Sequence, residues 1–274
     1  MRNPFYPSVV RGIEDVASER GYPLTLCNTD DNPLRERLYA DIVREERVAG
    51  VILASTCEVD ASARLLAEAG IPVVAIDRRP AASFVDSVVV DNERGTAEAV
   101  RHLASEGFHR IAVIAGPAHL STGQERLAGF RQGLTAAGLP DRPEYVKVGD
   151  FRPSSGERAM EELLALTAGP DAVLVCNNLM TIGALRVLRR RGVAIPAEMG
   201  IVGFDDGDWA ELLTPPLTAV VQPTYEIGTC AAQALFERID QIGGSAGDPA
   251  REIVLPLRLV VRGSSLRAAQ PPHY

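Results

Sequence analysis

Short apolar runs alternate with amphipathic stretches along the whole chain, and this alternation restricts the fold more than any other feature of the sequence. The apolar runs are continuous rather than alternating, which is typical of strands buried on both faces of a sheet. The stretches between them have helical periodicity, and glycine directly follows five of them, at Gly21, Gly70, Gly107, Gly138 and Gly192. Glycine is expected there because helices often end on a residue with positive φ. The pattern predicts βαβ units and parallel sheets, an α/β fold.

Nine runs are predicted to be strands: 50–54, 73–76, 87–90, 111–115, 145–148, 172–175, 200–204, 219–221 and 253–261. The predicted helices span 8–20, 33–46, 61–69, 94–106, 123–137, 155–167, 180–191 and 225–242. So many strands fit two sheets better than one, and no flexible linker divides the chain. We therefore expect two Rossmann-like lobes joined by three crossovers, at Asp91-Asn92, at Val221-Gln222-Pro223 and within residues 252–257, where Pro256 interrupts the run. The predicted lobes are 1–91 with 223–252 and 92–222 with 253–266, followed by a tail at 267–274.

Composition and charge exclude several classes of function. The net charge is −8 and Lys147 is the only lysine, which argues against nucleic-acid binding by this segment. No apolar run is long enough to span a bilayer, and no signal peptide opens the sequence, so a cytoplasmic protein is expected. The four cysteines (Cys27, Cys57, Cys176, Cys230) lack CxxC spacing and are expected to be buried free thiols. No residue pattern indicates a metal site, a cofactor or an enzyme, because histidines lack ligand spacing and no P-loop, Rossmann fingerprint or G-x-S-x-G occurs.

Polar side chains follow several of the predicted strands. The clearest case is Val202-Gly203-Phe204-Asp205-Asp206, in which a buried strand ends on two carboxylates. Asp77-Arg78, Asn177 and Gln222 stand in comparable places. Because ligands of parallel α/β sheets lie beyond the carboxyl ends of the strands, this repetition predicts a small-molecule receptor rather than a catalyst.

Ordered blocks of the sequence resemble the regulatory region of the lactose-repressor family of transcription factors, whose fold is shared with periplasmic sugar-binding proteins. These blocks are Asn3-Pro4-Phe5-Tyr6, Leu26-Cys27-Asn28-Thr29, Ile76-Asp77-Arg78, Val90-Asp91-Asn92, Gly116-Pro117, Thr122-Gly123 with Arg126, Gly149-Asp150-Phe151, Cys176-Asn177-Asn178, Gly203-Phe204-Asp205-Asp206, Pro215-Pro216-Leu217-Thr218 and Val261-Arg262-Gly263-Ser264. The resemblance implies a type I periplasmic-binding-protein fold. It also implies an amino-terminal helix-turn-helix, absent from this sequence, and a strand ahead of Asn3, so the chain looks truncated within the fold.

The resemblance assigns ligand contacts to eleven residues: Asn3, Phe5, Tyr6, Asp77, Arg78, Thr122, Arg126, Phe151, Asn177, Asp205 and Gln222. Each has a structural alternative. Phe5 and Tyr6 are either aromatic plates against a ligand ring or staples of the first helix, and Asn3 and Thr122 are either ligand contacts or helix caps. Asp77-Arg78 is either a sugar-binding pair or a loop ion pair, and Arg126 is either in the cleft or solvated. Asp205 is the strongest site; Asn178 is expected to be scaffold, and Asp206 and Asp208 to cap the next turn.

Together these residues match the pattern of ribose-binding relatives. The sequence therefore predicts the effector-binding and dimerisation region of a regulator that senses a small sugar, a pentose such as ribose. A purine-sensing regulator and a solute-binding protein of a sugar transporter remain open alternatives. A two-fold homodimer is expected, with the apolar faces of the first helix and of helix 225–242 as contributors, and operator DNA is expected to bind only through the helix-turn-helix.

Overall fold

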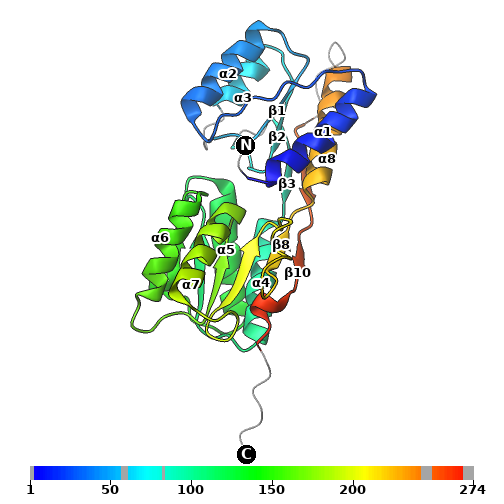
Figure 1. Ribbon diagram of the computed structural model, residues 1–274. Helices are drawn as coiled ribbons and strands as arrows, with labels where there is room; N and C mark the ends of the chain where they lie inside the picture. The colour runs from blue at the N-terminus through cyan, green and yellow to red at the C-terminus, as the bar shows by residue number, and fades with distance from the viewer. Residues whose placement is uncertain (1–2, 57–60, 82–83, 242–248, 268–274) are drawn as a thin grey trace, which may run out of the picture. The chain divides into compact units, whose positions relative to one another are not determined.

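The computed structural model describes residues 3–56, 61–81, 84–241 and 249–267, and the chain forms two compact units (Figure 1). Unit 1 comprises Met1–Val90, His119–Thr122 and Pro223–Pro256, and unit 2 comprises Asp91–Ala118, Gly123–Gln222 and the chain from Leu257 onward. Cys57, Ile242, His273 and most of the predicted tail lie outside the described residues. Both units contain parallel sheets with helices, so the predicted α/β class is confirmed.

Unit 1 is built on a four-stranded sheet in the order β1-β2-β3-β9. Its strands are β1 (Val51–Leu53), β2 (Val73–Ile76), β3 (Asp86–Val90) and β9 (Glu252–Leu255), and all three pairings are parallel. The helices are α1 (Phe5–Glu19), α2 (Pro33–Glu45), α3 (Ala61–Glu68) and α8 (Thr224–Asp240). α1 packs on α8, and α2 packs on α3.

The α1–α8 contact uses the apolar faces that the sequence suggested for dimerisation. Val9 and Ile13 of α1 and Ile227 of α8 are buried. A Cβ atom added to Gly12 would lie 2.3 Å from the carbonyl oxygen of Tyr225, so the two helix backbones touch. The expectation that these two faces are dimer contributors is therefore wrong, because each helix covers the apolar face of the other.

Unit 2 is built on a six-stranded sheet in the order β10-β8-β7-β6-β4-β5. Its strands are β4 (Ile111–Ala115), β5 (Val146–Val148), β6 (Ala172–Val175), β7 (Gly200–Phe204), β8 (Thr218–Val221) and β10 (Arg258–Val260), and only the β10–β8 pairing is antiparallel. One core cluster joins α4 (Asn92–Ser105) and α5 (Ser121–Ala136) to the sheet. A second joins α6 (Pro153–Leu164) and α7 (Asn178–Arg191), so helices cover both faces. Short 3-10 turns lie at Pro143–Tyr145 and Gly263–Ser265.

Local sequence signals are reproduced closely, including the crossover expected at Pro256, and the exception is Cys27. All five glycines expected after helices have positive φ, between 68° and 84°. The predicted run 253–261 forms two strands in different sheets, β9 and β10, with Pro256 between them. Cys27 is exposed rather than buried, because the segment around it joins neither sheet, whereas Cys176 is buried.

No helix among the described residues is long and apolar enough to cross a membrane.

Candidate functional site

Three of the predicted ligand residues have a backbone conformation that residues other than glycine rarely adopt. Asp77 follows β2 with φ of 66°, Asp205 follows β7 with φ of 72°, and Phe151 follows β5 by three residues with φ of 61°. Such conformations cost free energy and are concentrated at ligand-binding and catalytic positions. In each case the side chain is presented at the carboxyl end of a parallel strand, where ligands of this fold class bind.

In unit 1, Asp77 forms a group with Tyr6 and Arg78. The Tyr6 hydroxyl donates to Asp77 Oδ2 at 3.5 Å, and Arg78 Nε lies 3.7 Å from the same oxygen. Burial raises the pKa of Tyr6 well above its usual value, and the neighbouring Asp77 charge adds to the rise. Tyr6 therefore remains a neutral hydroxyl that can donate to an oxygen.

Arg78 also holds neighbouring loops in place. Its Nη1 donates to the Ser55 carbonyl at 2.6 Å and its Nη2 donates to Asp31 Oδ1 at 2.7 Å, and the residue is only 6% exposed. The loop after β1 and the loop before α2 are thus fixed to the end of β2. Arg78 therefore holds two loops in place, in addition to forming the local pair with Asp77 that the sequence suggested.

The first residues of unit 1 take structural positions. Asn3 Oδ1 accepts from the Phe5 backbone N–H at 3.1 Å, at the start of α1. Phe5 is 5% exposed and its ring meets that of Tyr6 edge-on, with centroids 5.0 Å apart. Asn3 thus binds the first N–H of α1 from the position before the N-cap, which is Pro4 and has no side-chain cap, and Phe5 supports the Tyr6 ring from inside the unit.

In unit 2, Asp205 and Gln222 are brought together although 17 residues separate them. Gln222 Nε2 donates to Asp205 Oδ1 at 2.5 Å, and the Asp205 N–H donates to the Val220 carbonyl at 2.8 Å. Gln222 is 6% exposed, and its Oε1 has no hydrogen-bond partner among the described residues. A buried amide oxygen without a partner is costly, and a ligand hydroxyl could satisfy it.

Arg126 is the most deeply buried cation of unit 2, at 3% exposure. Its Nε donates to Asn92 Oδ1 at 2.8 Å and its Nη1 donates to the Cys176 carbonyl at 2.9 Å. Its Cζ atom lies 3.7 Å from the centroid of the Phe204 ring. The solvated alternative for Arg126 is wrong, because the guanidinium is held in a fixed plane against the strand ends.

The remaining predicted residues of unit 2 differ in their packing and in their hydrogen bonds. The Phe151 ring lies where Gly116 has no side chain, since a Cβ there would be 2.2 Å from Phe151 Cζ. Asn177 Oδ1 caps α7, accepting from the backbone N–H groups of Leu179 and Met180 at 2.9 and 3.1 Å. The amide atoms of Asn178, expected to be scaffold, are buried without a partner among the described residues.

Thr122 is 2% exposed, and its hydroxyl oxygen has no partner within the described ranges. An N-cap hydrogen bond, the alternative raised for this residue, is not found there.

Asp206 does not cap the next turn, as the sequence suggested, but pairs with Arg262. Arg262 Nη1 and Nη2 donate to the two Asp206 oxygens at 2.9 and 2.8 Å, and Nη1 also donates to the Leu217 carbonyl. The loop that follows Asp205 is therefore fixed to the chain after β10.

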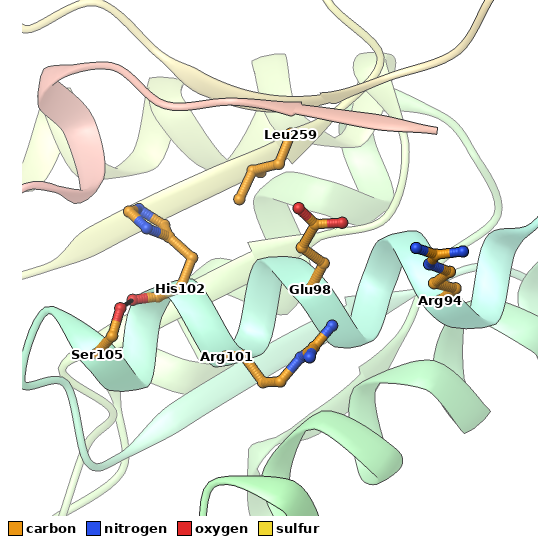
Figure 2. Close-up of a pocket in the computed structure, with 6 residues that line it drawn as sticks. All are labelled: Arg94, Glu98, Arg101, His102, Ser105 and Leu259. Carbon is orange, nitrogen blue, oxygen red and sulfur yellow. Dashed lines mark hydrogen bonds between the residues drawn. The ribbon is translucent and has the colours of Figure 1, made fainter. Parts of the chain in front are cut away.

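A shallow groove lies on α4 of unit 2, lined by Arg94, Glu98, Arg101, His102, Ser105 and Leu259. Figure 2 shows Glu98 and His102 pointing from α4 toward Leu259 on β10. His102 Nε2 lies 2.7 Å from Ser265 Oγ, and burial lowers the pKa of this histidine. None of the predicted ligand residues lines this groove, and no group of three or more possible metal ligands occurs in the described part of the chain.

Comparison with known proteins decides the family. Residues 100–265 match the family described as periplasmic binding protein-like domain. The HTH-type transcriptional regulator CelR of Thermobifida fusca is 39% identical over 266 residues, which cover 95% of this chain and 76% of that protein. The chain belongs to the lactose-repressor family. It is the effector-binding region of a transcriptional regulator of this family.

Solved structures of lactose-repressor-family proteins have the same fold. A putative ribose operon repressor from Burkholderia thailandensis matches with a TM-score of 0.84 and 34% identity, over 94% of this chain and 95% of that one. A complex of the regulator CelR with cellobiose matches with a TM-score of 0.87 and 36% identity, over 96% of this chain and 79% of that one. The periplasmic-binding-protein-like fold expected from the sequence is thereby confirmed.

Within this lactose-repressor fold, sequence reasoning missed Asn92 and Asp31. Asn92 is 1% exposed and links Arg126 to Glu125, to which its Nδ2 donates at 2.8 Å. Asp31 pairs with Arg78 across 47 residues of sequence. Asn92 stands in the Val90-Asp91-Asn92 block and could have been found there, whereas no sequence signal marks Asp31.

Proposed function

We propose that this chain binds a small sugar, a pentose such as ribose, as the effector of a transcriptional regulator. The observation that carries the proposal is the pair of strand-end carboxylates, Asp77 and Asp205, each held at positive φ in its own unit. Carboxylates accept hydrogen bonds from adjacent hydroxyl groups, which a sugar offers and an apolar ligand does not.

Each further residue has a proposed part in this binding. Arg126 and Arg78 donate to the ring and hydroxyl oxygens of the sugar. Two N–H groups of Arg78 already donate to protein oxygens, so its other donors are the ones proposed to bind the sugar. Gln222 offers its unpartnered Oε1 to a hydroxyl. Tyr6 and Phe151 supply aromatic surface for the apolar faces of the sugar ring, backed by Phe5.

The other predicted contacts have narrower proposed parts. Asn177 Oδ1 caps α7, so its Nδ2 group is the part of the side chain that is proposed to donate to the ligand. Thr122 can offer its unpartnered hydroxyl. Asn3 uses its Oδ1 at the start of α1, so its amide nitrogen is the atom available to a ligand.

Cellobiose is the second candidate effector, because the CelR regulator seen in complex with cellobiose is 36% identical to this chain. A purine also fits aromatic plates, but a purine base offers no pair of adjacent hydroxyls to Asp77 or Asp205. A transporter's solute-binding protein is disfavoured by the regulators among the relatives.

The whole regulator is proposed to act in the cytoplasm as a homodimer without enzymatic activity. The relatives are named transcriptional regulators, and the net charge of −8 leaves operator binding to a helix-turn-helix outside this sequence. Paired operator half-sites call for a two-fold symmetric protein.

A thermal-shift panel tests the effector. A ligand that binds only the native state raises the melting temperature, by an amount that grows with the ratio of its concentration to its Kd. Ribose, cellobiose, hypoxanthine and glucose are compared at matched concentrations. Stabilisation by ribose supports the proposal; stabilisation by cellobiose alone replaces the pentose by a disaccharide, and stabilisation by hypoxanthine alone rejects a sugar effector.

A further inference from the structure

Arg126 is a buried cation of unit 2 that forms no ion pair with a carboxylate of the described residues. Its partners are the Asn92 amide oxygen, the Cys176 carbonyl and the Phe204 ring, and none of them carries a charge. In unit 1, by contrast, the similarly buried Arg78 is paired with two aspartates. A charge without a counter-charge is costly in a protein interior, so the neutral surroundings of Arg126 call for an explanation.

Asn92 separates Arg126 from the carboxylate of Glu125. Its Oδ1 accepts from Arg126 Nε at 2.8 Å, and its Nδ2 donates to Glu125 Oε2 at 2.8 Å. The amide can make both bonds in only one orientation, because a flipped amide would set its N–H groups against the N–H of the guanidinium. Glu125 therefore fixes the Asn92 oxygen toward Arg126, while the charge of Glu125 stays one side chain away from the guanidinium.

The two helices that carry these three side chains are packed backbone to backbone. Asn92 begins α4, and Glu125 and Arg126 lie in α5. A Cβ atom added to Gly129 of α5 would lie 2.3 Å from the carbonyl oxygen of Glu93 in α4. So close an approach leaves the helices little room to shift, and the chain from Glu125 through Asn92 to Arg126 is therefore held in a fixed arrangement.

The other contacts of Arg126 hold its guanidinium at two strand ends. The Cys176 carbonyl, which accepts from Nη1, directly precedes Asn177. The Phe204 ring, which packs against the face of the guanidinium, directly precedes Asp205. Nη2 makes no hydrogen bond within the described part of the chain, so both of its N–H groups remain for a ligand.

We propose that Asn92 is a positioning residue for effector binding, which holds Arg126 through a neutral amide and so leaves the charge of the guanidinium to the effector oxygens. The inference rests on the proposed function. An aspartate in place of Asn92 would accept the same hydrogen bond but would also pair with Arg126, and the compensated guanidinium would bind a hydroxyl less strongly. Asn92 thus sets how strongly Arg126 binds, and it acts through Arg126 rather than on the ligand.

The test moves the carboxylate next to Arg126 while the hydrogen bonds and the net charge stay the same. In the double variant N92D/E125Q, the aspartate accepts from Arg126 and the glutamine amide donates to the aspartate. Because the buried guanidinium is then compensated, the melting temperature of the free protein should rise by about 2 °C or more. E93Q is the control, since Glu93 also joins α4 to α5, by accepting from Gln132 Nε2 at 2.7 Å, and it should leave the melting temperature within about 1 °C. An unchanged or lower melting temperature of the double variant overturns the proposal.

The second readout is the affinity for ribose, measured by isothermal titration. N92D/E125Q should bind ribose about 3- to 13-fold more weakly than the wild type although it is more stable, because charge-assisted hydrogen bonds are about twice as strong as neutral ones. In an R126Q background the same two substitutions should change the affinity less than about twofold, whereas a merely structural effect would weaken binding equally in both backgrounds. An equal loss in both backgrounds, or no loss in either, overturns the proposal. Ribose that fails to bind the wild type rejects only the pentose effector, and the melting temperatures still decide the part played by Asn92.

Discussion

Removing the Asp205 carboxylate should weaken effector binding strongly while leaving the fold nearly unchanged. A hydrogen bond to a charged group contributes about 1.5–3 kcal/mol, so Asp205→Ala should reduce affinity about 10- to 150-fold. Alanine at φ of 72° also adds roughly 1–2 kcal/mol of backbone strain, because only Gly, Asn and Asp adopt this region readily. Asp205→Asn avoids that strain and keeps an oxygen for the hydrogen bond from Gln222.

The asparagine variant therefore isolates the charge. A neutral bond is about half as strong as a charged one, so Asp205→Asn should cost about 0.75–1.5 kcal/mol per hydroxyl, or about 3.5- to 13-fold in affinity. Isothermal titration with ribose measures this, and Asp208→Asn in the same loop is the matched control. Unchanged affinity in both Asp205 variants, or an equal loss in the control, would refute the assignment of Asp205.

Three further predictions concern stability. Asp86→Ala should lower the free energy of unfolding, measured in urea, by about 2–3 kcal/mol. The substitution removes the carboxylate that Arg238 contacts at 2.6 and 2.8 Å. Breaking a fully buried ion pair costs roughly 3–5 kcal/mol, and we expect a smaller loss here because the Arg238 side chain is 18% exposed. A loss of stability under about 1 kcal/mol would contradict the prediction. Gly192→Ala should cost about 1 kcal/mol by strain alone, because nothing lies within 4 Å of the added Cβ, and Gly192→Asn should cost less. Burial lowers the pKa of His102, so its contribution to stability is present above pH ~6.5 and is lost as the pH falls through the folded pKa; His102→Gln should flatten this slope, and an unaltered slope would exclude the histidine.

The strand-end residues could be predicted from the sequence because their signals are local. Asp205 and Asp77 directly follow apolar runs that can only be buried strands, and in this fold class the positions after such strands meet ligands. The glycines after the helices were likewise readable, because a positive φ is a property of one residue and its neighbours.

Contacts between distant segments could not be read in this way. The pairing of Arg262 with Asp206 joins residues 56 positions apart, and Arg126 is fixed by Asn92 and by a backbone carbonyl that carries no side-chain signal. The burial of Glu36 contradicts what its charge suggests, and its bond to the Thr56 N–H explains it. These features depend on how elements pack, which periodicity does not encode.

The central claim is that strand-end carboxylates bind the hydroxyl groups of a sugar effector, and a crystal structure of this chain with ribose tests it most directly. We expect ribose hydroxyls within hydrogen-bond distance of the Asp205 carboxylate, with Gln222 Oε1 accepting from the ligand. Ribose bound elsewhere, such as in the groove of Arg94 and His102 on α4, or bound without a contact to Asp205, would contradict it.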